Sequence, residues 1–224
     1  SAVSSCAVPS PISTITPTPA ATPTETPLPP LGGRVELNFN LEWKYIAGDA
    51  NGAEGAAFDD SAWAYIDLPH STQFITPEDP SAYLGVSWYR KHFTADSQYR
   101  GRKVSIEFEA AMQSADVWVN GVKKLRHVGG YTPLTVDVSG DVAYDGTENI
   151  IAVKVDSRAN ADWAPGQPVV DFQYYGGLYR DVRMYVTDKL HVTDAVYAGK
   201  PAGGGVFPGL LPAVGSEVEE LQSG

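Results

Sequence analysis

The chain has 224 residues, with 16 Lys and Arg against 27 Asp and Glu, so its formal net charge is −11. A single cysteine, Cys6, excludes a disulfide framework and a cysteine-based zinc site. The acidic balance argues against nucleic acid as a partner, because affinity for phosphate backbones comes from Lys and Arg. No run approaches the roughly 20 apolar residues that a membrane-spanning helix needs.

Residues 1–32 are predicted to form an extended linker. The first 30 residues hold eight of the seventeen prolines and six threonines, and their only charged side chain is Glu25. Such a composition cannot form a packed core. Cys6 follows two serines and resembles the acylated cysteine of a bacterial lipoprotein; the alternative is an incidental free thiol. We therefore expect an extracellular or cell-surface protein that touches a membrane only through a lipidated Cys6.

Residues 33–198 are predicted to form one all-β domain. Short segments with period-two alternation are separated by Gly, Asn, Asp and Pro, as in 103–108, where Val104, Ile106 and Phe108 share one face. The pair Asn120-Gly121 predicts a tight hairpin turn between two strands. The expected strands are 34–39, 88–93, 103–108, 115–119, 122–125, 134–138, 150–155, 182–186 and 190–196. An antiparallel β-sandwich closes so many short strands naturally.

Residues 199–224 change character again. Three consecutive glycines at 203–205 are followed by two prolines and by acidic residues. This stretch has too little apolar content to close a domain, so we expect it to be the beginning of a further one.

The sequence lacks several common catalytic motifs. There is no phosphate-binding loop, no metalloprotease His pair and no Gly-x-Ser-x-Gly elbow. The four histidines are scattered. Glu107 and Glu109 would share a strand face, but this spacing is typical of a solvated rim or a structural contact rather than of a glycosidase carboxylate pair. Asp59 and Asp60 indicate a turn or a cap.

The long irregular segment 156–177 is the best candidate for binding. It contains Trp163, Asp171, Phe172, Tyr174 and Tyr175, and long loops in compact domains are often functional. Aromatic faces stack on the CH patches of sugar rings, and Asp, Asn and Arg hydrogen-bond to hydroxyls. The alternative is a loop that packs its own aromatic side chains against the sandwich or a neighbouring domain.

From about residue 37 to 208 the chain resembles the N-terminal sugar-binding domain of family 2 glycoside hydrolases, the group of β-galactosidases, β-glucuronidases and β-mannosidases. The order and spacing of several motifs carry the resemblance. They are Phe58-Asp59-Asp60-Ser61-x-Trp63, Leu68-Pro69-His70, Gly85-x-x-Trp88-Tyr89-Arg90-Lys91-x-Phe93, Ala115-Asp116-Val117-Trp118-Val119-Asn120-Gly121, His127-Val128-Gly129-Gly130-Tyr131-Thr132-Pro133, Asn149-Ile150-x-x-Val153-x-Val155-Asp156 and Asp171-Phe172-x-Tyr174-Tyr175-Gly176-Gly177-Leu178-Tyr179-Arg180-Asp181-Val182.

The resemblance implies a jelly-roll-like β-sandwich followed by an immunoglobulin-like domain and a TIM barrel. In the family the barrel holds both catalytic glutamates and works with retention through a covalent glycosyl-enzyme intermediate. The sequence shows no Asn-Glu pair of the kind that carries the acid/base glutamate. We therefore expect an N-terminal fragment with no catalytic residue of its own, most similar to β-galactosidases.

The resemblance also assigns a substrate contact to Asp171, which reaches the terminal β-linked sugar in related enzymes; its alternative is a cap on the following turn. Trp163 and Tyr174 are the expected aromatic neighbours. No cofactor is required, although relatives sometimes hold a cation near the sugar site, and Asp171 would be its ligand. Arg180 is interpreted as structural. Ser71 stands where many relatives have Asp, and residues 208–224 also depart from the family pattern.

Two other functions compete with this interpretation. One is a self-sufficient carbohydrate-binding module. The other is a purely architectural domain that packs on the barrel and touches no sugar.

Overall fold

The computed structural model describes residues 33–72, 83–158, 160–163 and 175–192. These residues form ten strands and one short 3-10 helix, Ser97–Tyr99. The strands are β1 (Val35–Asn38), β2 (Trp43–Ala47), β3 (Ala64–Ile66), β4 (Val86–Phe93), β5 (Lys103–Phe108), β6 (Ser114–Val119), β7 (Val122–Val128), β8 (Leu134–Asp137), β9 (Asn149–Asp156) and β10 (Val182–Thr187).

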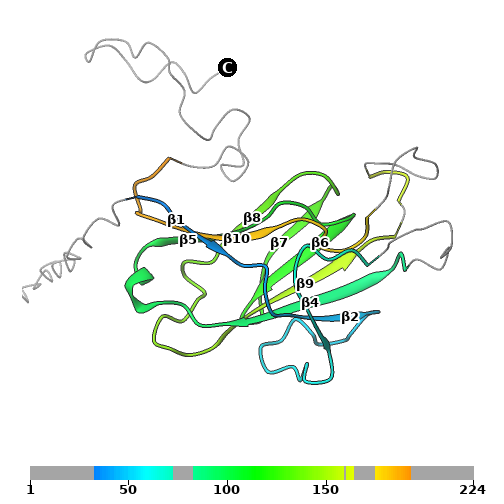
Figure 1. Cartoon of the computed structure of the whole chain (residues 1–224), viewed down its shortest axis with the longest axis horizontal. Coiled ribbons are helices and arrows are strands. Elements are labelled where there is room, and N and C mark those ends of the chain that lie inside the picture. The colour runs from blue at the N-terminus through cyan, green and yellow to red at the C-terminus, as the bar shows by residue number, and fades with distance from the viewer. Residues whose placement is uncertain (1–32, 73–82, 159, 164–174, 193–224) are drawn as a thin grey trace, which may run out of the picture.

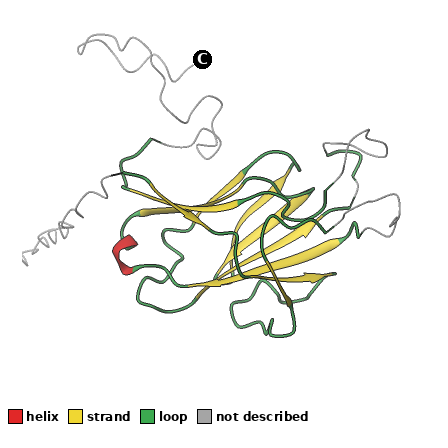
Figure 2. Cartoon of the chain, viewed as in Figure 1, coloured by secondary structure: helices red, strands yellow, loops and turns green. Residues whose placement is uncertain are grey.

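The strands form two layers that face each other (Figure 1 and Figure 2). One sheet has the order β1-β10-β5-β8, and the other has the order β3-β2-β4-β9-β6-β7. All neighbouring pairs are antiparallel. The predicted all-β antiparallel sandwich is therefore confirmed, and its more specific jelly-roll name stays a prediction.

The main core lies between the two sheets. On β5, the predicted alternation is observed: Val104, Ile106 and Phe108 are fully buried, and the residues between them are half-buried. Trp43 of β2 packs edge-on against Phe108 across the layers, with ring centroids 6.2 Å apart. Alternating apolar side chains on both inner faces thus account for the closure of the sandwich.

A second, smaller apolar cluster lies on the outer face of the six-stranded sheet. Ala53 and Trp63 belong to the connection between β2 and β3, and they pack over Trp88 and Ala152. Trp88 in turn stacks on Trp118 of β6 at 5.3 Å between ring centroids. This connection therefore covers part of a face that would otherwise meet solvent.

The hairpin prediction is confirmed. Val119 pairs with Val122, and both turn residues have positive φ, 48° at Asn120 and 84° at Gly121, as a tight two-residue turn requires. The sequence pattern does not predict β2 and β3. It predicts a strand over 190–196, but residues 190–192 are not in one, and 193–196 lie outside the described residues. No helix in the described part of the chain is long and apolar enough to cross a membrane.

Candidate functional site

One end of the sandwich gathers five connections, and we call it the loop end. Its described residues are 70–72, 111–113, 129–131, 157–158 with 160–163, and 175–179. It lies at the right of Figure 1, where β4 begins and β9 ends. Backbone hydrogen bonds join these connections. The amide of Thr72 donates to Gly176 (3.0 Å), and that of Met112 donates to Gly177 (3.0 Å).

Two buried polar side chains fix the stems of the segment in which the sequence predicts sugar binding. The Ser157 hydroxyl donates to the Met112 carbonyl (2.7 Å) and accepts a hydrogen bond from the Gly177 amide (3.0 Å). Gln113 Nε2 donates to the Trp163 carbonyl at 3.0 Å. Both Ser157 and Gln113 are fully buried. The stems on either side of residues 164–174 are thus held by the connection between β5 and β6.

The two glycines of the family motif allow this close packing. Gly177 has φ of 82°, and a Cβ there would meet the Tyr89 hydroxyl and the His70 carbonyl. The Tyr89 hydroxyl lies within hydrogen-bond distance of His70 Nδ1 (3.0 Å) and accepts from the Leu178 amide (3.4 Å). Burial lowers the pKa of His70, which favours the neutral ring.

Aromatic side chains cluster beside these stems. Tyr175 and Tyr179 stack with ring centroids 5.7 Å apart and planes 11° apart, and the Tyr179 hydroxyl donates to the Gly130 carbonyl at 2.5 Å. Tyr131 is 38% exposed. The Arg180 guanidinium lies 5.6 Å from the Tyr179 ring centroid, and its structural role stays a prediction. The loop end therefore offers aromatic surface and polar groups, which together suit a sugar.

The structure places only part of the predicted sugar site. Trp163 lies at the loop end and is half-buried. Asp171 and Tyr174 lie outside the described residues. The expected cation site at Asp171 therefore lies outside them as well. Among the residues that are described, no three His, Cys, Asp or Glu side chains are gathered so that they could hold a metal ion.

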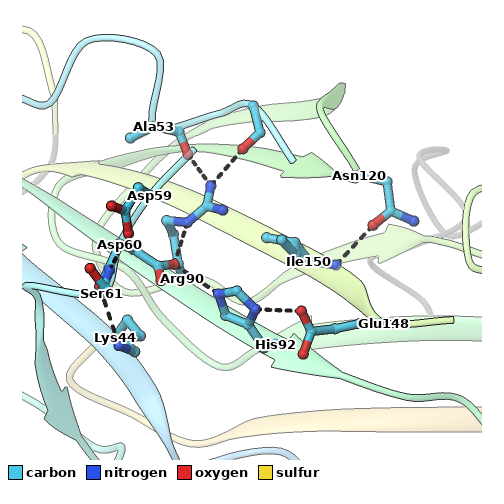
Figure 3. Close-up of polar contacts among 11 residues, drawn as sticks. Lys44, Ala53, Asp59, Asp60, Ser61, Arg90, His92, Asn120, Glu148 and Ile150 are labelled. Atoms are coloured by element: carbon cyan, nitrogen blue, oxygen red, sulfur yellow. Dashed lines mark hydrogen bonds and ion pairs between the residues drawn. The ribbon is translucent and has the colours of Figure 1, made fainter. Parts of the chain in front are cut away.

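The pair Asp59-Asp60 divides into two different roles (Figure 3). The Asp59 carboxylate accepts from the Ser61 amide at 3.0 Å, as the turn prediction requires. Asp60 is instead buried and accepts from Arg90 Nε (2.7 Å) and His92 Nε2 (2.8 Å). Burial alone would raise the pKa of Asp60, but the hydrogen bonds from His92 and Arg90 outweigh it and lower that pKa. Sequence reasoning missed this network, because its partners come from distant strands.

His92 extends the network to the surface. Its Nδ1 lies 2.9 Å from Glu148 Oε2, and Arg90 also donates to the carbonyls of Ala53 (2.5 Å) and Gly55 (2.9 Å). The segment that covers the outer face of the six-stranded sheet is therefore attached to β4 by charged groups as well as by apolar packing.

Glu107 and Glu109 are the other carboxylate pair, and Glu109 has a structural role. Glu109 lies 3.4 Å from Arg183, and Arg183 also pairs with Glu36 and Asp181. Glu109 therefore makes a structural contact of the kind that the sequence favours for it.

Comparisons with known proteins connect the fold to a family. The family model described as "Glycosyl hydrolases family 2, sugar binding domain" matches residues 52–188. The chain is 41% identical over 170 residues to a β-galactosidase of Thermoanaerobacter pseudethanolicus, covering 74% of this chain and 22% of that protein. It is 33% identical over 179 residues to a β-glucuronidase of Formosa agariphila, covering 73% of this chain and 18% of that one.

Solved structures agree with the sequence comparisons. The crystal structure of Bacteroides uniformis β-glucuronidase matches with a TM-score of 0.67 and 32% identity, over 72% of this chain and 19% of that one. The chain thus spans about a fifth of the length of these relatives. Because the family model covers more than half of the chain, the protein belongs to the family 2 glycosyl hydrolases and matches their sugar-binding domain.

Proposed function

We propose that this chain is the N-terminal sugar-binding part of a retaining exo-β-glycosidase of the β-galactosidase type. Hydrolysis takes place in a TIM barrel that lies outside these 224 residues, and an immunoglobulin-like domain connects the two. The observation that supports this most is the 41% identity to a β-galactosidase, of which the matched region is 22%.

In this proposal the loop end faces the terminal β-linked sugar. A carboxylate at position 171 accepts hydrogen bonds from two neighbouring sugar hydroxyls, and Trp163 and Tyr174 provide aromatic surface. The Ser157 and Gln113 contacts hold the described residues that precede and follow 164–174. A preorganised contact costs less conformational entropy when the sugar binds.

The Pro/Thr-rich residues 1–32 act as a tether in the same proposal. The domain works outside the cell or at its surface, which is supported by this composition and by the position of Cys6 near the start of the tether. Mass spectrometry of the protein from its native membrane fraction tests the tether: an acyl chain on Cys6 is expected, and an unmodified Cys6 in the soluble fraction would contradict it.

A hydrolysis assay tests the proposed function. The longer enzyme that contains this domain is assayed with chromogenic β-galactoside and β-glucuronide, and the 224-residue chain is assayed alongside it. We expect the longer enzyme to prefer the galactoside and the chain alone to be inactive. Turnover by the chain alone would contradict the assignment of catalysis to a barrel.

β-Glucuronidase activity is the second candidate, because several similar proteins and structures carry that name. A higher kcat/KM on the glucuronide in the same assay would favour it over the β-galactosidase type. Hydrolysis of neither substrate, combined with tight sugar binding by the chain alone, would favour a self-sufficient carbohydrate-binding module.

A further inference from the structure

A groove of about 880 Å3 lies on the outer face of the six-stranded sheet, away from the loop end, and we call it the outer groove. Its lining is Glu42, Lys44, Phe58, Asp59, Asp60, Ser61, Tyr65, Ile66, Asp67, His92 and Glu148. His92 is near the end of β4 opposite to the loop end. It is six residue steps along the strand from Val86, which corresponds to about 20 Å. The volume is within the roughly 300–1,000 Å3 of small-molecule sites.

The first feature of the outer groove is an exposed aromatic ring on a strand. Tyr65 is 71% exposed, although it belongs to β3 and its backbone pairs with Lys44 of β2. The Lys44 ammonium lies 4.3 Å from the Tyr65 ring centroid and donates to the Asp60 carbonyl at 3.2 Å. Lys44 therefore supports one side of the ring, while much of the ring surface remains open to solvent.

The second feature is a set of hydrogen-bond acceptors in the same groove. The Glu42 amide donates to the Asp67 carboxylate at 2.8 Å, which places these two acidic residues next to each other at one end of the β2–β3 pair. Asp59 and Glu148 also line the groove and lie on either side of Asp60 and His92 (Figure 3). Ionised carboxylates accept hydrogen bonds and donate none, so they match a ligand that carries several hydroxyl donors.

The third feature is a fixed floor. Asp60 is 6% exposed and is held by Arg90 and His92, so the floor is already ordered in the absence of a ligand. Acidic side chains alone would suit a cation as well as a sugar. However, the described residues contain no group of three or more acidic or imidazole side chains that could hold a metal ion, and a metal would make no use of Tyr65.

We propose that the outer groove is a second carbohydrate site, which binds a neutral sugar unit of a glycan by stacking on Tyr65 and by hydrogen bonds to Glu42 and Asp67. A uronic acid is excluded by repulsion from the acidic lining. The site is distinct from the loop end and would hold a glycan chain on the domain.

NMR titration of the 15N-labelled 224-residue chain tests this proposal. The probe is a neutral β-galactan oligosaccharide, and an oligogalacturonate of the same length is the charged control. We expect the galactan to shift the amide signals of Ser61 and Tyr65 and the oligogalacturonate to leave them unchanged. Unmoved groove signals, or equal binding of the uronate, would overturn the proposal.

Variants separate this site from the loop end. Tyr65→Ala should weaken binding at the groove roughly fivefold or more, as expected for loss of an aromatic anchor, whereas Tyr65→Trp should keep it. Tyr131→Ala removes an exposed tyrosine at the loop end and should leave the groove affinity unchanged. Equal effects of Tyr65→Ala and Tyr131→Ala would overturn the assignment. If the proposed hydrolytic function is wrong, the hydrolysis assay of the longer enzyme shows it. The NMR signals of the outer groove do not depend on that result.

Discussion

Replacing Asp60 with alanine should destabilise the fold strongly. Asp60 is 6% exposed and Arg90 is 0% exposed, so the variant leaves a fully buried guanidinium without its carboxylate partner. It also removes the acceptor for His92 Nε2. Loss of one member of a buried ion pair typically costs about 3–5 kcal/mol.

The lower end of this range applies to Asp60. Arg90 keeps its hydrogen bonds to the carbonyls of Ala53 and Gly55, so part of the buried charge remains compensated. We therefore expect a loss of about 3 kcal/mol in the free energy of unfolding, which lowers the urea midpoint by about 1.5 M if the slope is about 2 kcal/mol/M.

Urea unfolding followed by Trp fluorescence measures this loss, and the neighbouring residue supplies the control. Asp59→Ala removes an exposed hydrogen bond to the Ser61 amide and should shift the urea midpoint far less than Asp60→Ala. The double variant Asp60→Ala/Arg90→Met should recover part of the loss, because it leaves no unpaired buried charge. If Asp60→Ala and Asp59→Ala differ by less than about 1 kcal/mol, the network does not stabilise the fold as argued.

Two further predictions concern His92 and Gly177. Burial alone would lower the pKa of His92, but Asp60 and Glu148 outweigh burial and raise that pKa above its ordinary 6.5, so its stabilisation is complete below pH 6.5 and is lost as pH rises through the raised value. Urea unfolding at several pH values should show this loss in the native chain and a smaller one in His92→Gln; identical pH profiles would contradict it. Gly177→Ala should cost about 2–3 kcal/mol, from its positive φ and the contacts of the new Cβ. Gly140, whose Cβ position is open, provides the control: Gly140→Ala should change stability by less than about 0.5 kcal/mol in thermal unfolding, and equal effects would refute the steric argument.

The sequence predicts those parts of the fold that local patterns determine. β5 shows clean alternation, and the Asn120-Gly121 turn carries its own conformational preference, so both are predictable. β3 has only three residues, and it forms through pairing with β2 rather than through its own pattern. Strands of this length carry too little periodicity to be recognised.

The same contrast applies to the polar groups. The Asp59 turn depends on an amide two residues away, which a sequence pattern can indicate. The partner of Asp60 is 30 residues away on β4, and Ser157 joins Met112 to Gly177 across three connections. Such contacts depend on sheet order and register, which no local pattern contains.

The central claim, that this domain contributes Asp171 to a sugar site completed by a catalytic barrel, is tested most directly by kinetics of the longer enzyme. Asp171→Ala should lower kcat/KM by an amount equivalent to about 1–3 kcal/mol, as for one lost hydrogen bond to a charged group. Asp145→Ala, at an exposed position outside the loop end, is the matched control and should leave kcat/KM unchanged. An unchanged kcat/KM in Asp171→Ala would contradict the claim and favour a purely architectural domain.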